Sequence, residues 1–208
     1  MVLTAVDPVF TAGVDFKEER APGWNPYDNQ FTANPGKALR AMATPVVCAV
    51  NGACVSGGLE LALSSSLVVA SERARFADTH ARLGVVAAWG LTALLPRAVG
   101  IRKATEMSIT GNFVDAAEAL RIGLVNHVVP AAALESATMG MARRLAKGPA
   151  LAIRFNKQLV NKELEERVTR LYEMAFAMEA ITFRSADHVE AVASFTERRP
   201  PTFQRGHR

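Results

Sequence analysis

The chain has 208 residues, of which 50% are hydrophobic and 21% are charged, as in one globular domain or one domain with an appendage. No apolar run approaches the ~20 residues of a membrane span, and the start, MVLTAVDPVF, does not resemble a signal peptide. The net charge of +4 comes from residues 101–208, whose basic residues lack the interleaved aromatic residues of nucleic-acid modules. We therefore expect a cytoplasmic protein whose partners are neither membranes nor nucleic acids.

The first part of the chain predicts short buried strands separated by turns. Val2–Val6 is apolar enough for a core strand, but chain termini usually fray, so we expect either a sheet edge or missing upstream residues. Ala21–Gly36 is polar and rich in Pro, Gly and Asn, which predicts a surface loop. Pro45–Asn51 (PVVCAVN) predicts a strand covered on both faces, and Gly57 to about Ser65 suits a helix.

The two cysteines, Cys48 and Cys54, lie in or beside the strand predicted at residues 45–51. Two thiols in such a position are more often free and reduced than joined in a disulfide or bound to a metal. We therefore expect a reducing compartment and no metal site.

The middle of the chain alternates between strand and helix patterns, which predicts an α/β fold. Asp115 precedes Glu118 by three residues, and this spacing predicts a capped helix start. The other predicted elements are strands at Leu67–Ala70, Arg75–Ala77 and Leu124–Val129, and helices at Trp89–Val99 and Lys103–Ile109.

Beyond Pro130 the pattern is helical throughout. Apolar residues recur there at steps of four and three, which predicts a helix face that packs on the core or on another subunit. These residues are Leu164, Val168, Leu171, Ala175 and Met178. The sequence therefore divides into a core of strands and helices, residues 1–130, and a helical region, residues 131–208.

A glycine turn within VNGACVSGGLELAL (Val50–Leu63) carries the first candidate chemistry. Gly57 and Gly58 allow a ligand to approach the backbone where a helix begins. The first amides of a helix lack intrahelical acceptors and lie at the positive end of its dipole, so an oxygen anion binds well there. Glu60 could bond to these amides or could face the ligand as a general base.

A second Ala-Gly turn, FTAGVDFKEE (Phe10–Glu19), follows the first predicted strand. If each turn offers one backbone N–H, the two form an oxyanion hole, which stabilises an enolate or a tetrahedral oxyanion. This pairing favours Glu60 as a base beside an anion site.

Five motifs, in order along nearly the whole chain, resemble those of the enoyl-CoA hydratase/isomerase (crotonase) family. AGVDFKE is similar to its AGxDxKE turn, and VNGACVSGGLELAL to its NGxxxGGGxELAL turn, with Ser56 in place of one glycine. The others are SERARFADTHARLGVVAAWGLTALLPRAVG, GNFVDAAEALRIGLVNHVVP and FTERRPPTF. The resemblance implies the crotonase-like spiral of ββα units, shared with Clp-type proteases, and a helical C-terminal trimerisation region. It also implies that roughly 50 residues at the family's N-terminus have no counterpart here.

The resemblance implies that the backbone N–H groups of Val14 and Gly57 bind the thioester oxygen of an acyl-CoA substrate as it becomes an enolate. Glu60 corresponds to the glutamate that holds or activates the attacking water. The family also implies a homotrimer, or a hexamer built as a dimer of trimers. Coenzyme A is part of the substrate, so no separate cofactor is expected, and its implied contacts are Lys17, Phe195 and Arg198.

The second glutamate of the hydratases is missing, because the position twenty residues after Glu60 is His80. A histidine, with an unperturbed pKa of about 6.5, could protonate the α-carbon, or it could be only a polar wall of the pocket. Asp78 could orient His80. In an extended segment the two would lie roughly 6–7 Å apart on the same face, so direct pairing would be possible but stretched.

Three smaller departures from the family pattern flank this segment. Ser66 replaces the usual aspartate before a strand, and Ala87 and Ala88 replace a usual Pro-Gly turn. Beside Trp89, these alanines reshape and narrow the predicted acyl pocket.

Hydration of a 2,3-enoyl-CoA, a reaction of fatty-acid metabolism, is therefore the default function. Isomerisation, retro-aldol cleavage or decarboxylation could use the same oxyanion hole. A non-catalytic acyl-CoA-binding homologue is a second hypothesis, because it would need no second glutamate. A serine hydrolase that uses Ser56 and His80 is a third, which the sequence supports only weakly.

Overall fold

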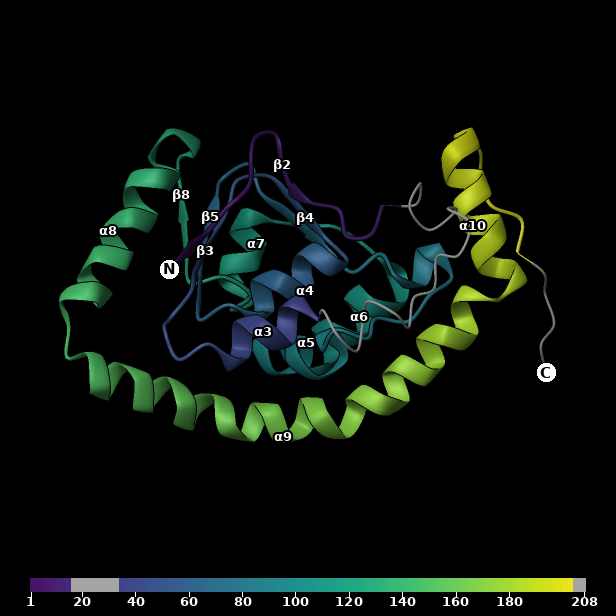
Figure 1. Ribbon diagram of the computed structural model, residues 1–208. Coiled ribbons are helices and arrows are strands. Elements are labelled where there is room, and N and C mark those ends of the chain that lie inside the picture. The colour runs from purple at the N-terminus through teal and green to yellow at the C-terminus, as the bar shows by residue number, and fades with distance from the viewer. Residues whose placement is uncertain (16–33, 204–208) are drawn as a thin grey trace.

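The computed structural model describes residues 1–15 and 34–203, whose strands form two four-stranded sheets (Figure 1). The first sheet contains, in spatial order, β1 (Val2–Leu3), β3 (Val47–Val50), β5 (Leu67–Ser71) and β8 (His127–Val129). The second contains β2 (Val9–Thr11), β4 (Ala53–Val55), β6 (Arg75–Ala77) and β7 (Val114–Asp115). All pairs of neighbouring strands are parallel except β6 with β7.

Successive strands alternate between the two sheets, which makes the core a spiral. β1, β3 and β5 each enter the first sheet, and β2, β4 and β6, which follow them along the chain, enter the second. Helix α4 (Gly57–Ser64) completes the central turn of this spiral after β3 and β4. The predicted α/β spiral of ββα units is therefore confirmed.

The central strand β3 lies within the apolar segment predicted at residues 45–51. All its residues are buried, and it pairs in parallel with both β1 and β5. Burial raises the pKa of the Cys48 thiol to about 12, and Cys54 in β4 is also buried and free. The prediction of two buried free thiols is confirmed.

Strand β1 is shorter than predicted, although it lies at the edge of its sheet in the described part of the chain. The chain leaves the sheet after β1, where the hydroxyl of Thr4 donates to the carbonyl of Ala49 at 3.2 Å. Val6 is 89% exposed, and a turn at residues 7–8 then leads into β2. The second half of the strand predicted at Val2–Val6 is therefore wrong.

Helix α3 (Pro35–Ala41) occupies the end of the segment that was predicted to be a loop. The side chain of Asn34 caps it by accepting a hydrogen bond from the Lys37 amide at 2.8 Å. Pro35 suits the first turn, because no intrahelical acceptor is available there for its missing N–H. The loop prediction is therefore wrong at Pro35 and Gly36, and its part up to residue 33 lies outside the described residues.

Helices α5 (Leu91–Val99), α6 (Ile101–Thr110) and α7 (Ala116–Arg121) complete the first part of the chain. α5 begins later than predicted because Gly90, with φ of 121°, precedes it. Asp115 caps α7 as predicted, since its carboxylate accepts from the Glu118 amide at 2.8 Å. The strand predicted at Leu124–Val129 is confined to its last three residues.

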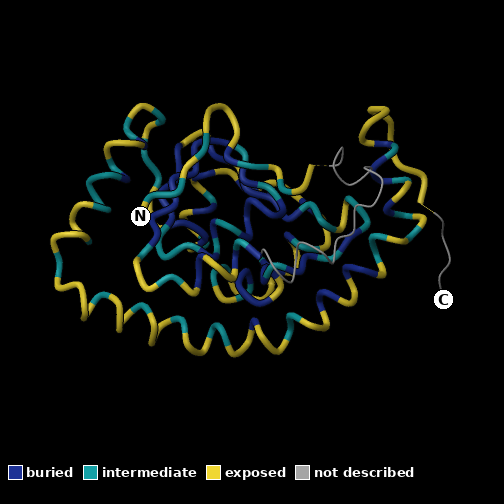
Figure 2. The backbone as a smooth tube through the Cα atoms, in the orientation of Figure 1, coloured by how far each residue is buried: buried dark blue, intermediate teal, exposed yellow. Residues whose placement is uncertain are grey.

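The described residues beyond Pro130 contain helical elements and no strand: a short 3₁₀ turn at Ala131–Ala133, α8 (Leu134–Lys147), α9 (Ala150–Phe183) and α10 (Ala186–Glu197). The long helix α9 runs along one side of the core, with α8 at one end and α10 at the other (Figure 1). Figure 2 shows that the first part of α9 is mostly exposed and that its later turns include buried residues. No helix in the described ranges is both long and apolar enough to cross a membrane.

The apolar stripe predicted on α9 packs mainly within the chain. Val168 packs with residues of α5, and Leu164 and Leu171 lie beside it, partly buried. Ala175 is also buried, whereas Met178 is 47% exposed. The core interpretation is therefore confirmed for this stripe except at Met178.

Candidate active site

Two glycine turns, one after β2 and one after β4, lie against each other. Gly13 has φ of 98°, and a Cβ atom there would lie 3.2 Å from the amide nitrogen of Gly57. A Cβ atom at Gly58 would lie only 2.5 Å from the carbonyl oxygen of Thr11. The close approach of the two turns therefore depends on glycine at these positions.

The amides of Val14 and Gly57, predicted as oxyanion donors, lie beside the same pocket. Neither amide donates a hydrogen bond to a described residue. Gly57 is the first residue of α4, where amides lack intrahelical acceptors and the helix dipole is positive. The structure thus brings together the two turns that the sequence paired, at a position suited to a negatively charged oxygen.

Ser56 joins β4 to α4 with φ of 50°, a conformation that residues other than glycine rarely adopt. Its backbone N–H donates to the carbonyl of Ala77 at 3.0 Å, and its hydroxyl lies 2.5 Å from the hydroxyl of Thr79. These bonds fix the glycine turn to the last residue of β6 and to the segment that follows it. Because the Ser56 hydroxyl is bonded to Thr79 and not to His80, the serine-hydrolase hypothesis gains no support.

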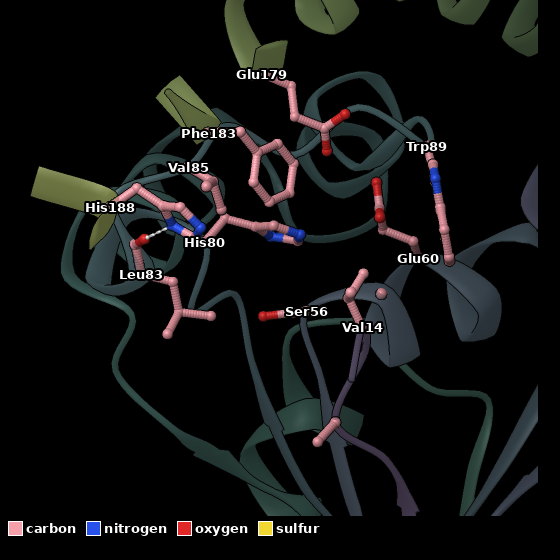
Figure 3. Close-up of a pocket in the computed structure, with 12 residues that line it drawn as sticks. Val14, Ser56, Glu60, His80, Leu83, Val85, Trp89, Glu179, Phe183 and His188 are labelled. Carbon is pink, nitrogen blue, oxygen red and sulfur yellow. Dashed lines mark hydrogen bonds between the residues drawn. The ribbon is translucent and has the colours of Figure 1, made fainter. Parts of the chain in front are cut away.

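Three ionisable side chains from distant parts of the sequence surround a common space in the pocket (Figure 3). Glu60 comes from α4, His80 from the segment just before the 3₁₀ turn at Ala81–Leu83, and Glu179 from α9. Val14 and Gly57 of the two glycine turns line the same pocket. The pocket therefore combines backbone donors with acid–base side chains.

Glu60 is almost fully buried, with 2% of its surface exposed. Its Oε1 accepts a hydrogen bond from the backbone N–H of Leu91 at 3.1 Å, so it bonds to an amide of the next helix and not of its own. Burial raises the pKa of Glu60, while the charge of His80 and the hydrogen bond from Leu91 oppose this rise. A buried carboxylate whose pKa is raised and that faces a pocket is suited to act as a general base.

His80 pairs closely with Asp78, whose Oδ1 lies 2.7 Å from the Nδ1 atom of the ring. The stretched pairing that an extended segment would give does not occur, because His80 has φ of −54° and ψ of −47° and leads directly into a 3₁₀ turn. Burial lowers the pKa of His80, but the hydrogen bond to Asp78 and the charges of Glu60, Asp78 and Glu179 outweigh burial, so the pKa is raised. His80 is therefore arranged to carry a proton.

Glu179 was not among the residues predicted from the sequence. It is buried, with 6% of its surface exposed, and it lines the pocket. Ala175 and Phe183 lie one helical turn before and after it, so an acidic residue interrupts an apolar face of α9. An acidic residue within an apolar helix face is a pattern visible in the sequence, and the same pattern marks Glu60 in α4.

Aromatic rings close the side of the pocket formed by the C-terminal helices. The rings of Phe183 and His188 meet edge to face, with centroids 5.0 Å apart. Nδ1 of His188 lies 2.6 Å from the carbonyl oxygen of Leu83, and this contact joins α10 to the 3₁₀ turn after His80.

Across the described ranges, no group of three His, Cys, Asp or Glu residues could hold a metal ion.

A sequence model of the enoyl-CoA hydratase/isomerase family matches residues 1–206. The chain belongs to this family. The Mycobacterium bovis protein named "Probable enoyl-CoA hydratase echA8" is 35% identical, in a match that covers 98% of this chain and 79% of that protein. The mitochondrial enoyl-CoA hydratase of Pongo abelii is 30% identical, and the match covers 98% of this chain and 70% of the relative.

Solved structures from the same family have the same fold. The crystal structure of an enoyl-CoA hydratase/isomerase from Pseudoalteromonas atlantica matches with a TM-score of 0.88 and 32% identity, over 98% of this chain and 80% of that chain. An enoyl-CoA hydratase from Mycobacterium tuberculosis matches with a TM-score of 0.71 and 38% identity, over 85% of this chain and 75% of that chain. Sequence and structure therefore agree on the crotonase-type fold.

The residues matched to the coenzyme A contacts of the crotonase family lie away from the pocket or outside the described residues. Lys17 belongs to the segment that is not described. Phe195, near the end of α10, is 67% exposed, and Arg198 follows the helix with φ of 54° and is also exposed. Neither of these two lines the pocket. The structure therefore does not bring them to the acid–base groups of the same chain.

The departures from the crotonase pattern have local structural explanations. The hydroxyl of Ser66 accepts a hydrogen bond from the Val46 amide at 3.1 Å, which ties the start of β5 to β3. Ala87 and Ala88 are buried, and Trp89 lines the pocket next to Glu60 (Figure 3). The indole of Trp89 also lies against the glycine turn, because a Cβ atom at position 57 would be 3.3 Å from its ring.

Proposed function

We propose that this chain catalyses the addition of water to a 2,3-enoyl-CoA thioester. The observation that carries the proposal is the meeting, in one pocket, of the Val14 and Gly57 amides with the side chains of Glu60 and His80. Relatives named enoyl-CoA hydratase in mycobacteria and in Pongo abelii support this reaction.

The backbone amides act on the thioester oxygen. When the oxygen of water bonds to the β-carbon, the π electrons of the double bond shift toward the thioester, and negative charge develops on its oxygen. The N–H groups of Val14 and Gly57 stabilise this charge, and their hydrogen bonds are stronger in the transition state than in the substrate. The two glycine turns hold these donors in place before the substrate arrives.

Glu60 and His80 move the protons. Glu60 takes a proton from the attacking water, and its burial makes the carboxylate a stronger base than a solvated glutamate. His80, held at Nδ1 by Asp78, gives a proton to the α-carbon and converts the enolate to a 3-hydroxyacyl thioester. Exchange with solvent then removes the proton from Glu60 and returns one to His80.

Coenzyme A enters this reaction as part of the substrate, so the proposal includes no separate cofactor. We assign its contacts to Lys17, Phe195 and Arg198 on the family resemblance, since cationic side chains pair well with the phosphates of coenzyme A. The same resemblance supports a place in fatty-acid metabolism and a cytoplasmic location. We also keep residue 130 as the boundary between spiral core and helical region, because the strands of the described residues end with β8.

A homotrimer, or a hexamer of two trimers, is part of the same proposal. Leu151, Phe155 and Leu159 follow one another at steps of four on α9, and their exposed fractions are 64%, 53% and 70%. Such an exposed apolar stripe is suited to contact with another subunit. Light scattering coupled to size-exclusion chromatography should give the mass of three or six chains, and a monomer at micromolar concentration would contradict the assembly.

Hydration of crotonyl-CoA, followed by the loss of absorbance of the enoyl thioester, tests the proposed reaction. We expect turnover by the unaltered chain and a kcat lower by roughly 10²–10⁴-fold in Glu60→Gln, because the amide cannot take the proton of water. The glutamine can still accept the hydrogen bond from Leu91, so the fold should persist. Glu166→Gln, on the exposed face of α9, is the matched control and should keep its activity.

The alternatives make different predictions in the same assay. Tight binding of acyl-CoA esters with no turnover of any tested ester would contradict hydration and favour a non-catalytic binder. Conversion of a 3-enoyl-CoA, without hydration of the 2-enoyl isomer, would instead favour an isomerase that uses the same oxyanion hole.

A further inference from the structure

Glu179 is a buried acid in the pocket for which the reaction described above has no role. Its side chain comes from α9, and Figure 3 shows its carboxylate directed toward the space between Phe183 and Glu60. Burial of a carboxylate is unfavourable, and most helix positions that face a protein core hold apolar residues instead. An acid retained at such a position in a pocket therefore indicates a task in the chemistry of the site.

The groups that face His80 from the surrounding elements are mainly acidic. They are Asp78 on its own segment, Glu60 on α4 and Glu179 on α9, and the charge of each raises the pKa of His80. The other titratable residue of the pocket is His188 on α10, whose Nδ1 is bonded to the carbonyl of Leu83. His80 therefore lies in a negatively charged environment that three separate elements provide.

The replacement of an acid by a histidine at this position creates a specific requirement. A glutamic acid that donates a proton is neutral before the transfer, whereas a histidine that donates a proton must first be a cation. Burial disfavours that cation, and a histidine with an ordinary pKa is mostly neutral at neutral pH. A proton-donating His80 therefore needs more negative charge around it than a glutamic acid would need at the same place.

We propose that Glu179 is a positioning residue that keeps His80 protonated and ready to donate, an inference that rests on the proposed hydration. It acts through His80 by its charge, and it belongs to a different element from Asp78. Glu179 thus supplies from α9 the carboxylate that the sequence lacks at position 80. The helical C-terminal region thus contributes to the acid–base chemistry of the spiral core.

Titration of His80 by NMR tests this inference without any need for turnover. The chain has four histidines, and the signal that disappears in His80→Gln assigns the relevant ring. In Glu179→Gln, which has nearly the same shape but no charge, the pKa of His80 should fall by roughly half a unit to one unit. Glu173→Gln, exposed on the same helix, is the matched control and should leave the titration unchanged.

Kinetics provide the second readout. The alkaline limb of kcat/KM should move to lower pH in Glu179→Gln by the same amount as the His80 titration, which lowers activity above that limb by roughly 3–10-fold. Activity at pH values below the limb should be nearly unchanged. Glu179→Asp keeps the charge, so its alkaline limb should lie close to that of the unaltered chain. If Glu179 had a purely structural role, Glu179→Gln would lower the melting temperature without moving the limb.

The outcomes separate this inference from the proposed function. Hydration by the unaltered chain, together with an unchanged His80 titration in Glu179→Gln, would overturn the role of Glu179 and leave the hydratase proposal intact. A shifted titration in a chain that hydrates no ester would support the effect on His80 and contradict the hydratase proposal. If the glutamine variant does not fold, Glu179→Met provides a second neutral side chain of similar length for the same titration.

Discussion

The pocket wall proposed to bind the oxyanion is made of backbone, whereas the wall proposed for acid–base chemistry is made of side chains. The first is held by two neighbouring strands, β2 and β4, and by glycines at which a Cβ atom would be crowded by neighbouring atoms. The second collects Glu60, His80 and Glu179 from three separate elements. The backbone wall is therefore expected to accept very few substitutions, whereas the side-chain wall can change residue type if the charges around it change as well.

Substitution of Gly13 in the backbone wall should lower activity strongly. In Gly13→Ala the new Cβ atom would lie 3.2 Å from the Gly57 nitrogen, at a φ that alanine rarely adopts, so the turn must shift. Displacement of the Val14 amide removes one oxyanion donor, and we expect kcat with crotonyl-CoA to fall by roughly 10²–10³-fold.

The control for this variant is Gly140→Ala. Gly140 lies in α8, and a Cβ atom there meets no other atom within 4 Å, so activity should be unchanged. If Gly13→Ala hydrates crotonyl-CoA as fast as the unaltered chain, the backbone wall tolerates a side chain at this position. The assignment of the oxyanion hole to these turns would then be wrong.

The backbone wall could be predicted from the sequence because its determinants are local. Each turn follows a strand, and its glycines occur within a few residues of one another, so the motif contains the geometry. The same holds for the strands β3, β5 and β6 and for the Asp115 cap of α7, which all depend on short patterns. The sequence does not predict helix α3, because the proline and glycine at its start are typical of loops, although the Asn34 side chain caps the helix start.

The side-chain wall could be predicted only in part. Glu60 was found because it belongs to the glycine motif, but its bond to the Leu91 amide depends on where α5 packs. The close pairing of His80 with Asp78 depends on the helical backbone at His80, which the polar sequence around it does not specify. Glu179 lies at the far end of the sequence, and only the packing of α9 on the core brings it to the pocket.

For the unaltered chain, kcat/KM should fall by about tenfold per pH unit on each side of its optimum, a smaller change than that expected for Gly13→Ala. The proposed mechanism needs Glu60 deprotonated and His80 protonated, so kcat/KM with crotonyl-CoA should have a bell-shaped profile. The pKa of Glu60 is raised by burial above its ordinary 4.5, which moves the acid limb to higher pH. The pKa of His80 is raised above its ordinary 6.5 by its acidic neighbours, against the effect of burial, which moves the alkaline limb upward.

The free energy of unfolding should follow the same two groups. Because both pKa values are raised in the folded chain, the folded state binds more protons than the unfolded state in a limited pH window for each group. This window runs from the ordinary pKa, 4.5 for Glu60 and 6.5 for His80, up to the raised pKa of the folded chain. The contribution of the two groups is therefore complete below their ordinary pKa values and is lost as pH rises through the folded pKa values. Urea unfolding at a series of pH values should show this decline in the free energy of unfolding, and Glu60→Gln should remove the part of the decline at lower pH.

In the kinetic profile, an alkaline limb of kcat/KM at or below the ordinary pKa range of histidine would mean that the acidic side chains do not control His80. The charge-based account of the side-chain wall would then fail.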